Sequence, residues 1–234
     1  MNGALVLAGG AEFGGRMADV DRAALELAGG ANAPVCIIPT AAAPDNNHAR
    51  AGQNGVRWFR SLGARDVTAL PLIDPVSAND AAISATLRTA RLIYLLGGFT
   101  HYLGQTLAGS ASWQAVLDAH TAGAVVAGSS AGAMVVCEWY YDPSSGQLAA
   151  GLGLVPNACV LPHHNTFGQR WAGKLSALLP DTTLIGIDER TGMISDPTSS
   201  GRSWHCYGQG AITLYRHGAI QTYNAGTPFR LTTA

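Results

Sequence analysis

Strand-length apolar runs alternate with segments of helical spacing along most of the chain. Several of these runs are continuous, as in parallel strands that are covered by helices on both faces. The predicted strands are residues 4–8, 35–39, 68–72, 92–96, 124–127, 158–161 and 184–187. Between them, apolar residues recur at steps of three and four, which predicts amphipathic helices. The predicted helices are residues 16–28, 48–62, 80–89, 113–120 and 169–178.

The repeated alternation of strand and helix indicates the fold class. Right-handed crossovers between parallel strands give a three-layer, doubly wound α/β structure with a mostly parallel sheet. After about Met193, short segments rich in β-branched and aromatic residues predict antiparallel strands at 203–207, 211–215 and 219–223. No linker-like stretch or internal repeat divides the chain, so we expect one domain over residues 1–234.

Composition narrows the functional class. The chain has 234 residues, of which 47% are hydrophobic and 12% charged, enough to build a sizeable core. A formal net charge of −1 and the lack of a basic run argue against a nucleic-acid partner. The longest apolar runs fall far short of the ~20 residues of a membrane helix, so no membrane partner is expected. The uncharged start does not resemble a signal peptide, and four separated cysteines suit reduced thiols, so we expect a cytoplasmic location.

Residues 125–133 carry the strongest chemical signal in the chain. Ser130 is the serine of a G-x-S-x-G sequence that follows a predicted strand and precedes a helix-compatible run, the context of a nucleophile elbow. Its neighbours are Gly, Ala or Ser, which allow the backbone to turn tightly. The N–H groups that follow Ser130 are able to stabilise an oxyanion. The structural alternative is a serine-capped helix with glycines for close packing.

A serine hydroxyl needs a base within hydrogen-bond reach and an acid that orients the base. His163 and His164 come directly after the predicted strand 158–161, at the same end of the sheet as Ser130. Spacing alone leaves the acid open among Asp188 and Glu189, which end the next predicted strand, and Glu138 and Asp142.

A glycine pair, Gly97 and Gly98, follows the predicted strand 92–96. Glycines there allow close approach of the backbone and offer a second oxyanion donor, or they make a tight turn into the next helix. The glycines after residue 8 lack the G-x-G-x-x-G spacing of a dinucleotide site, and no Cys/His metal-ligand spacing is present. We therefore expect neither a cofactor nor a metal.

Five segments, in order over nearly the whole chain, resemble the dipeptidase E / cyanophycinase family of serine peptidases. They are residues 95–98 (LLGG), 128–133 (GSSAGA), 151–156 (GLGLVP), 162–163 (PH) and 186–189 (GIDE). The GSSAGA stretch is the most specific of them. The resemblance implies a class I glutamine amidotransferase-like fold of the flavodoxin type. Glutaminase relatives of that fold use a cysteine at the elbow, so the serine argues against glutamine amidotransfer.

The resemblance also implies roles for single residues. Ser130 would be the nucleophile, His163 the general base and Glu189 the acid, in the chain order Ser–His–Glu. The backbone N–H groups of Gly98 and Ala131 would form the oxyanion hole. A homodimer is suggested by the resemblance alone.

The sequence departs from both named members of the family at the residues that set specificity. Leu161 and Pro162 precede the histidine where cyanophycinases have Asp-Gln, and the Gly-Gly-Gly-Asn loop of dipeptidase E is absent. Cyanophycinases also carry Gln near Thr100 and His101, and a run of arginines after the histidine, where this chain has only Arg170. Neither cyanophycin nor an aspartyl dipeptide is therefore indicated as the substrate.

The expected reaction is hydrolysis of small peptides or isopeptide-like amides through an acyl-enzyme. A catalytically silent binding domain and an esterase with the same triad are the alternatives. An arginine fork suits a substrate carboxylate, and Arg170 is preferred to Arg16, Arg50 and Arg190 because it lies one predicted turn past His163. The residues expected to contact the substrate are Gly97, Thr100, His164 and Arg170.

Overall fold

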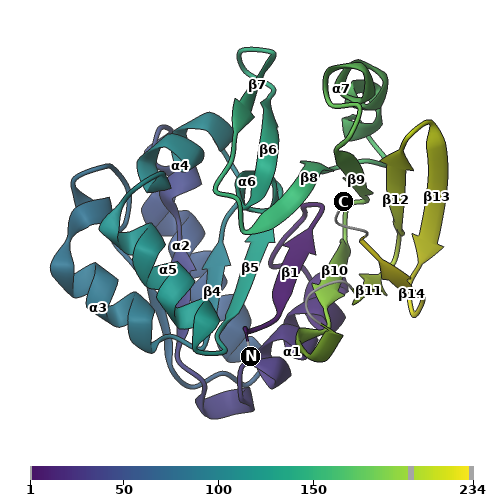
Figure 1. Cartoon of the computed structure of the whole chain (residues 1–234). Coiled ribbons are helices and arrows are strands. Elements are labelled where there is room, and N and C mark those ends of the chain that lie inside the picture. Colours follow the sequence, from purple (N-terminus) through teal and green to yellow (C-terminus); the bar gives the residue numbers. More distant parts are fainter. Residues whose placement is uncertain (1, 200–202, 232–234) are drawn as a thin grey trace.

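A computed structural model describes residues 2–199 and 203–231, and its strands form two sheets (Figure 1). The larger sheet has the order β14-β11-β10-β1-β5-β4-β2-β3. Its core is parallel, from β1 through β5, β4 and β2 to β3, and β10, β11 and β14 extend it as antiparallel strands. The strands are β1 (Leu5–Ala8), β2 (Val35–Ile38), β3 (Val67–Ala69), β4 (Leu92–Leu95), β5 (Val125–Ser129), β10 (Thr191–Ser195), β11 (Ser203–Gly208) and β14 (Pro228–Arg230).

Helices cover both faces of the larger sheet. Successive residues of a strand point to opposite faces. In β1, Val6 packs into the core beneath α1 and α2, whereas Leu7 packs into the core shared with α3, α4 and α5. The helices are α1 (Ala18–Leu27), α2 (His48–Ser61), α3 (Ala81–Thr89), α4 (Thr100–Leu107), α5 (Ala111–Thr121), α6 (Ala131–Val135) and α7 (Ala172–Leu178). Short 3-10 helices span Gly15–Met17, Gly30–Asn32, Thr40–Ala42, Ser77–Asn79, Gly168–Trp171 and Pro197–Ser199.

The smaller sheet has the order β13-β12-β9-β8-β6-β7. Its centre is parallel, with β8 between β6 and β9, and antiparallel pairs lie on both sides. The buried residues of β8 and β9 belong to the same hydrophobic core as α3, α4 and α5. The smaller sheet therefore shares a core with the helices on one face of the larger sheet. The strands are β6 (Cys137–Asp142), β7 (Gln147–Ala150), β8 (Val155–Leu161), β9 (Thr183–Ile187), β12 (Ala211–Arg216) and β13 (Ala219–Asn224).

The predicted fold class is confirmed: helices enclose a sheet with a parallel centre, and antiparallel strands follow at the C-terminal end. Every predicted strand and helix overlaps an observed one. The hairpin of β6 and β7, helix α4 and strands β10 and β14 are additional, and so is the division into two sheets. That all of residues 1–234 form a single domain stays a prediction. No helix in the described part of the chain has the length and apolarity needed to cross a membrane.

The two sheets meet where β1, β5 and β8 end. The N–H of Ser130 donates to Ala8 O (2.9 Å) at the end of β1. The N–H of His163, past the end of β8, donates to Gly9 O (2.8 Å) in the next loop of the larger sheet. Ligands of parallel sheets bind at the carboxyl ends of strands. The fold therefore brings the predicted site residues Ser130, from the larger sheet, and His163, from the smaller one, to the same edge.

Candidate active site

Ser130 sits in a strained turn between β5 and α6. Its backbone angles are φ 48° and ψ −112°, in a region that residues with a side chain rarely adopt. Glycines make the turn possible, since a Cβ on Gly128 would lie 2.5 Å from Gly132 C, and one on Gly132 would lie 2.2 Å from Leu95 O. The turn therefore packs directly onto its own helix and onto β4. This is the geometry of a nucleophile elbow, with the half-buried serine still reachable from outside.

His163 lies beside the serine hydroxyl. Its Nε2 is 3.0 Å from Ser130 Oγ, within hydrogen-bond distance. The histidine backbone is also in the left-handed region, with φ 49°. Its carbonyl accepts from the N–H groups of Thr166, Phe167 and Gly168, each at 3.0 Å, so the loop that carries the ring is tightly wound.

Glu189 binds the other nitrogen of the ring. Its Oε1 is 2.8 Å from His163 Nδ1. The N–H of Glu189 donates to Asn165 Oδ1 (3.0 Å), which ties the acid to the histidine loop. Since the imidazole is then held at both nitrogens, the arrangement Ser130–His163–Glu189 matches the nucleophile, base and orienting acid of a serine hydrolase.

The other candidate acids bind elsewhere. Asp188 Oδ1 is 3.4 Å from His164 Nδ1, and its Oδ2 accepts from Ala211 N–H. Glu138 Oε2 accepts from Asn157 N–H (2.7 Å). Asp142 closes a turn: burial acts to raise its pKa, but hydrogen bonds from Ser145 and Ser144 lower the pKa below its usual value. The structure thus brings Glu189, and none of these three carboxylates, to His163.

The histidine ring is enclosed on two sides. Phe167 stacks on it with ring centroids 4.8 Å apart and planes 21° apart. On Gly10, a Cβ would lie 2.3 Å from His163 Cε1, so only a glycine allows this approach. Packing therefore restricts the ring to the plane in which it reaches both Ser130 and Glu189.

A cavity of about 340 Å³ opens beside the serine. Its walls are mostly apolar: Gly98, Thr100, Ser130, Met134, Pro143, Pro162, His163, Phe167 and Trp171. Gly98 has φ +139°, and a Cβ there would lie 2.3 Å from Ala41 O. Thr100 is buried and donates to Met134 Sδ (3.8 Å). Two of the expected oxyanion and substrate residues, Gly98 and Thr100, thus share a cavity with Ser130.

Among the described residues, the backbone N–H groups of Gly98, in this cavity, and of Ala131, next to Ser130, have no acceptor. Ala131 is the first residue of α6, where an amide has no partner within the helix. In the described residues, nothing accepts a hydrogen bond from the N–H of Gly98. Gly97 differs, because its N–H donates to Glu12 Oε1 (3.3 Å).

The remaining predicted substrate residues lie outside this cavity. His164 is buried, with its Nε2 2.8 Å from the Tyr215 hydroxyl, and Gly186 packs against its ring. Arg170 is exposed, as are Arg16, Arg50 and Arg190. Gly97 lines a second cavity together with Gly98 and Glu12.

A buried carboxyl lies near Glu12. Asp21 in α1 is fully buried, and burial raises its pKa from 3.8 to about 7; a hydrogen bond from Trp58 opposes the rise and the charge of Glu12 adds to it. Burial also raises the pKa of Tyr94 well above its usual value, with Asp21 and Glu12 contributing. Asp21, Glu12 and Tyr94 thus form a group of interacting ionisable side chains that the sequence motifs do not mark.

Sequence analysis missed four residues that contact the site. Glu12, Gly10, Phe167 and Asn165 hold the elbow, the ring or the acid. One signal was present: Gly10 and Glu12 follow the end of β1 directly, where functional loops of parallel sheets lie. Phe167 and Asn165 follow His163 closely but belong to no motif.

Comparison with known sequences gives one consistent family. The profile of peptidase family S51 matches residues 5–196. The cyanophycinase of Geminocystis herdmanii is 28% identical over 239 residues, which cover 97% of this chain and 85% of that protein. A cyanophycinase of a Nostoc species is 28% identical over 225 residues, which cover 90% and 72%.

Solved structures agree. A peptidase from an acI-B1 Actinobacterium superposes with a TM-score of 0.88 at 30% identity, covering 99% of this chain and 98% of that one. A putative Peptidase E protein from Listeria monocytogenes EGD-e has a TM-score of 0.63 at 20% identity, covering 97% and 100%, and supports the fold alone. The resemblance to the dipeptidase E / cyanophycinase family is confirmed, and the chain belongs to peptidase family S51 as a serine peptidase.

Proposed function

We propose that the chain hydrolyses amide bonds of small peptides or isopeptide-like substrates through a Ser130–His163–Glu189 triad and an acyl-enzyme. One observation carries the proposal: two successive short contacts, of 3.0 Å and 2.8 Å, join the hydroxyl, the imidazole and the carboxylate. A serine becomes a useful nucleophile only when such a base is within reach.

In the first half of the reaction, Ser130 Oγ bonds to the carbonyl carbon while His163 Nε2 takes the hydroxyl proton. The electron pair of the C=O bond moves to oxygen and gives a tetrahedral oxyanion. When this collapses, the C–N bond breaks and the imidazolium returns its proton to the leaving amine. Glu189 stabilises the imidazolium and holds its tautomer through Nδ1.

In the second half, water attacks the ester on Ser130. His163 takes a proton from this water, the second tetrahedral intermediate collapses, and the proton returns to Ser130 Oγ as the acid leaves. The free N–H groups of Gly98 and Ala131 stabilise both oxyanions, and losing one such donor lowers turnover by about 10²–10³-fold in other hydrolases.

The cavity supports a small substrate. About 340 Å³ holds a dipeptide-sized group, and the walls made by Phe167 and Trp171 favour an apolar or aromatic side chain over a charged one. Arg170 is proposed to reach a terminal carboxylate from outside, with Thr100 contacting the group inside. Four buried, free cysteines support activity in a reducing compartment such as the cytoplasm.

Labelling by a fluorophosphonate tests the proposal. The wild-type protein should react at one site, and Ser130→Ala should abolish the reaction. Equal labelling of both proteins would remove Ser130 from the mechanism. A dipeptide library and an ester panel run in parallel then separate a peptidase from an esterase, and labelling without turnover of either would indicate a silent domain.

A further inference from the structure

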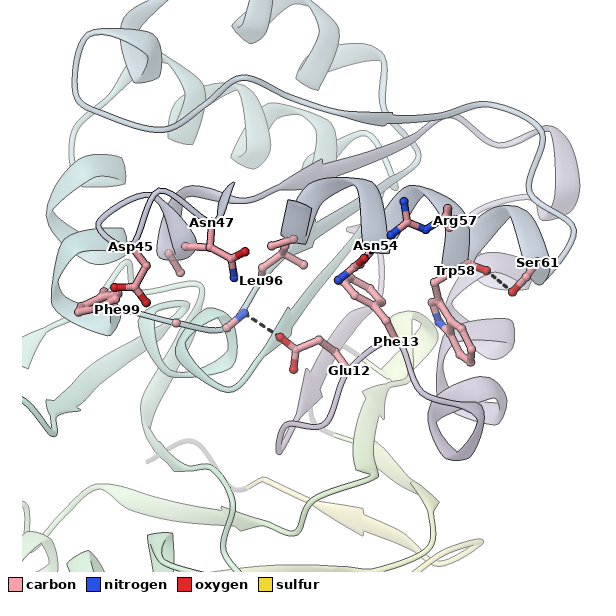
Figure 2. A pocket seen from close by; sticks show the side chains of 15 residues that line it. Glu12, Phe13, Asp45, Asn47, Asn54, Arg57, Trp58, Ser61, Leu96 and Phe99 are labelled. Atoms are coloured by element: carbon pink, nitrogen blue, oxygen red, sulfur yellow. Dashed lines mark hydrogen bonds between the residues drawn. The ribbon is translucent and has the colours of Figure 1, made fainter. Parts of the chain in front are cut away.

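Glu12 connects the two loops that surround the reacting atoms. Its Oε1 accepts from the N–H of Gly97 (3.3 Å), and its Oε2 accepts from Ser129 Oγ (2.9 Å). Gly97 precedes the glycine with the free N–H, and Ser129 precedes the nucleophile. Figure 2 shows the carboxylate reaching across from the loop after β1 toward the end of β4. One side chain therefore bonds to the residue before Gly98 and to the residue before the nucleophile.

The backbone on each side of Glu12 is held in a strained form. Ala11 has φ 60° and Phe13 has φ 58°, although neither is a glycine. Such conformations persist only where the surroundings fix them, and they concentrate at functional sites. The Phe13 ring supplies that fixation, because it packs against Tyr94 and Phe59 with centroids 5.4 Å and 6.3 Å away.

The same loop also contacts the histidine and the residue that follows the acid. Gly9 O accepts from His163 N–H, and Gly10 O accepts from Arg190 N–H (3.2 Å), next to Glu189. Gly10 packs closely against the His163 ring at Cε1. Residues 9–13 thus contact His163, Arg190, Gly97 and Ser129, and Glu12 is the member of this loop that reaches Gly97 and Ser129 through its side chain.

We propose that Glu12 is a positioning residue that fixes the glycine pair Gly97 and Gly98 and the elbow relative to each other; this rests on the proposed function. The need for such a clamp follows from the glycines, which are the most flexible of residues. A Cβ at position 97 would lie 3.0 Å from Glu12 Oε1 and 3.2 Å from Ser130 Cβ, so a larger residue there would have to displace one of these two side chains. With its N–H held by Glu12, Gly97 keeps the Gly98 N–H toward the cavity beside Ser130.

Glu12 lies half-buried on a cavity of about 570 Å³ that runs along α2 (Figure 2). Asp45 lines this cavity too, is exposed, and has no hydrogen bond to Gly97 or Ser129 among the described residues. Replacing Asp45 therefore removes a carboxylate from the same cavity without removing a hydrogen bond to Gly97 or Ser129, which makes it a matched control.

The test measures the rate of fluorophosphonate labelling together with the labelled fraction at completion. Glu12→Ala and Glu12→Asp should lower the rate by about 10–100-fold at full labelled fraction, because misplacement by about 1 Å costs up to about 10²-fold. Glu12→Gln should restore the rate to within about fivefold, since its carbonyl accepts from Gly97 and its amide reaches Ser129. Asp45→Ala should react like the wild type.

The labelled fraction separates positioning from folding. A folding defect lowers the fraction of protein that reacts, whereas a misplaced oxyanion site slows all molecules. A rate within about fivefold of wild type for Glu12→Asp, at full labelled fraction, would overturn the proposal, as would equal rates for Glu12→Asp and Glu12→Gln. If Glu12→Ala fails to fold, the labelling rates of Glu12→Asp and Glu12→Gln still test the proposal. If the wild-type protein is not labelled at Ser130, the proposed function is wrong, and the positioning role of Glu12 is wrong with it.

Discussion

Replacing Asp21 with asparagine should remove a pH dependence from the stability of the protein. Asp21 is fully buried in α1, and its Oδ2 accepts from Trp58 Nε1 (2.7 Å), a bond that the carbonyl of asparagine retains. Its Oδ1 has no partner among the described residues. A carboxyl in such surroundings is stable in its protonated form, and ionising it in the folded state costs free energy.

The magnitude follows from the pKa. Burial raises the pKa of Asp21 from 3.8 to about 7, and each step of one in pKa is worth about 1.4 kcal/mol, so complete ionisation costs at most about 4 kcal/mol. The folded state binds a proton that the unfolded state releases between these two values. The stabilising effect of the protonated form is therefore complete below about pH 4, declines as the pH rises, and is lost above about pH 7.

Urea unfolding at about pH 4, 6 and 8 measures this. The free energy of unfolding of Asp21→Asn, relative to wild type, should increase by about 4 kcal/mol between the lowest and highest pH. Asp19→Asn is the control, since Asp19 lies on the same helix with its side chain 81% exposed. A relative stability of Asp21→Asn that stays constant within about 1 kcal/mol would refute the reasoning.

Three further predictions concern the triad and the core. Glu189→Ala should lower kcat by about 10²–10⁴-fold in a peptide assay, whereas Asp142→Ala should have a mild effect; the reverse would favour the chain order Ser–acid–His. Phe167→Ala removes the ring that is stacked on His163. Because such a ring pair is worth about 0.5–1.5 kcal/mol, kcat should fall by up to about tenfold. An unchanged kcat would show that the stacking does not position His163. Leu87→Ala empties a fully buried site in α3 and should destabilise the protein by about 2–5 kcal/mol in urea, with the labelling rate of folded protein unchanged; a loss below about 1 kcal/mol would contradict the packing.

The fold class was predictable because it depends on local patterns. Continuous apolar runs mark strands that are buried on both faces, and the predicted strands 4–8, 92–96 and 124–127 match β1, β4 and β5 closely. The division into two sheets was not predictable. It depends on which strands pair, as when β10 joins β1 through Val6 and Ile194, far apart in the sequence.

The site shows the same contrast. Ser130 was identified from its neighbours, since the strained turn needs small residues on both sides. The choice between Asp188 and Glu189 needed the structure, because consecutive residues at a strand end point in opposite directions, one to His164 and one to His163. The contacts of Glu12 were not predictable from the sequence for another reason. Its partners lie 85 and 117 residues away along the chain, and no local pattern encodes such contacts.

The reactivity of the four cysteines should report local unfolding of the protein. All are buried, and burial raises the pKa of Cys36 and Cys159 to about 12 and that of Cys206 to about 11. Only a thiolate reacts with an alkylating reagent, so the native protein should resist one. Cys36 lies in β2, Cys137 and Cys159 in the smaller sheet, and Cys206 in β11. The order in which iodoacetamide modifies them would therefore report which sheet loosens first, without any engineered probe.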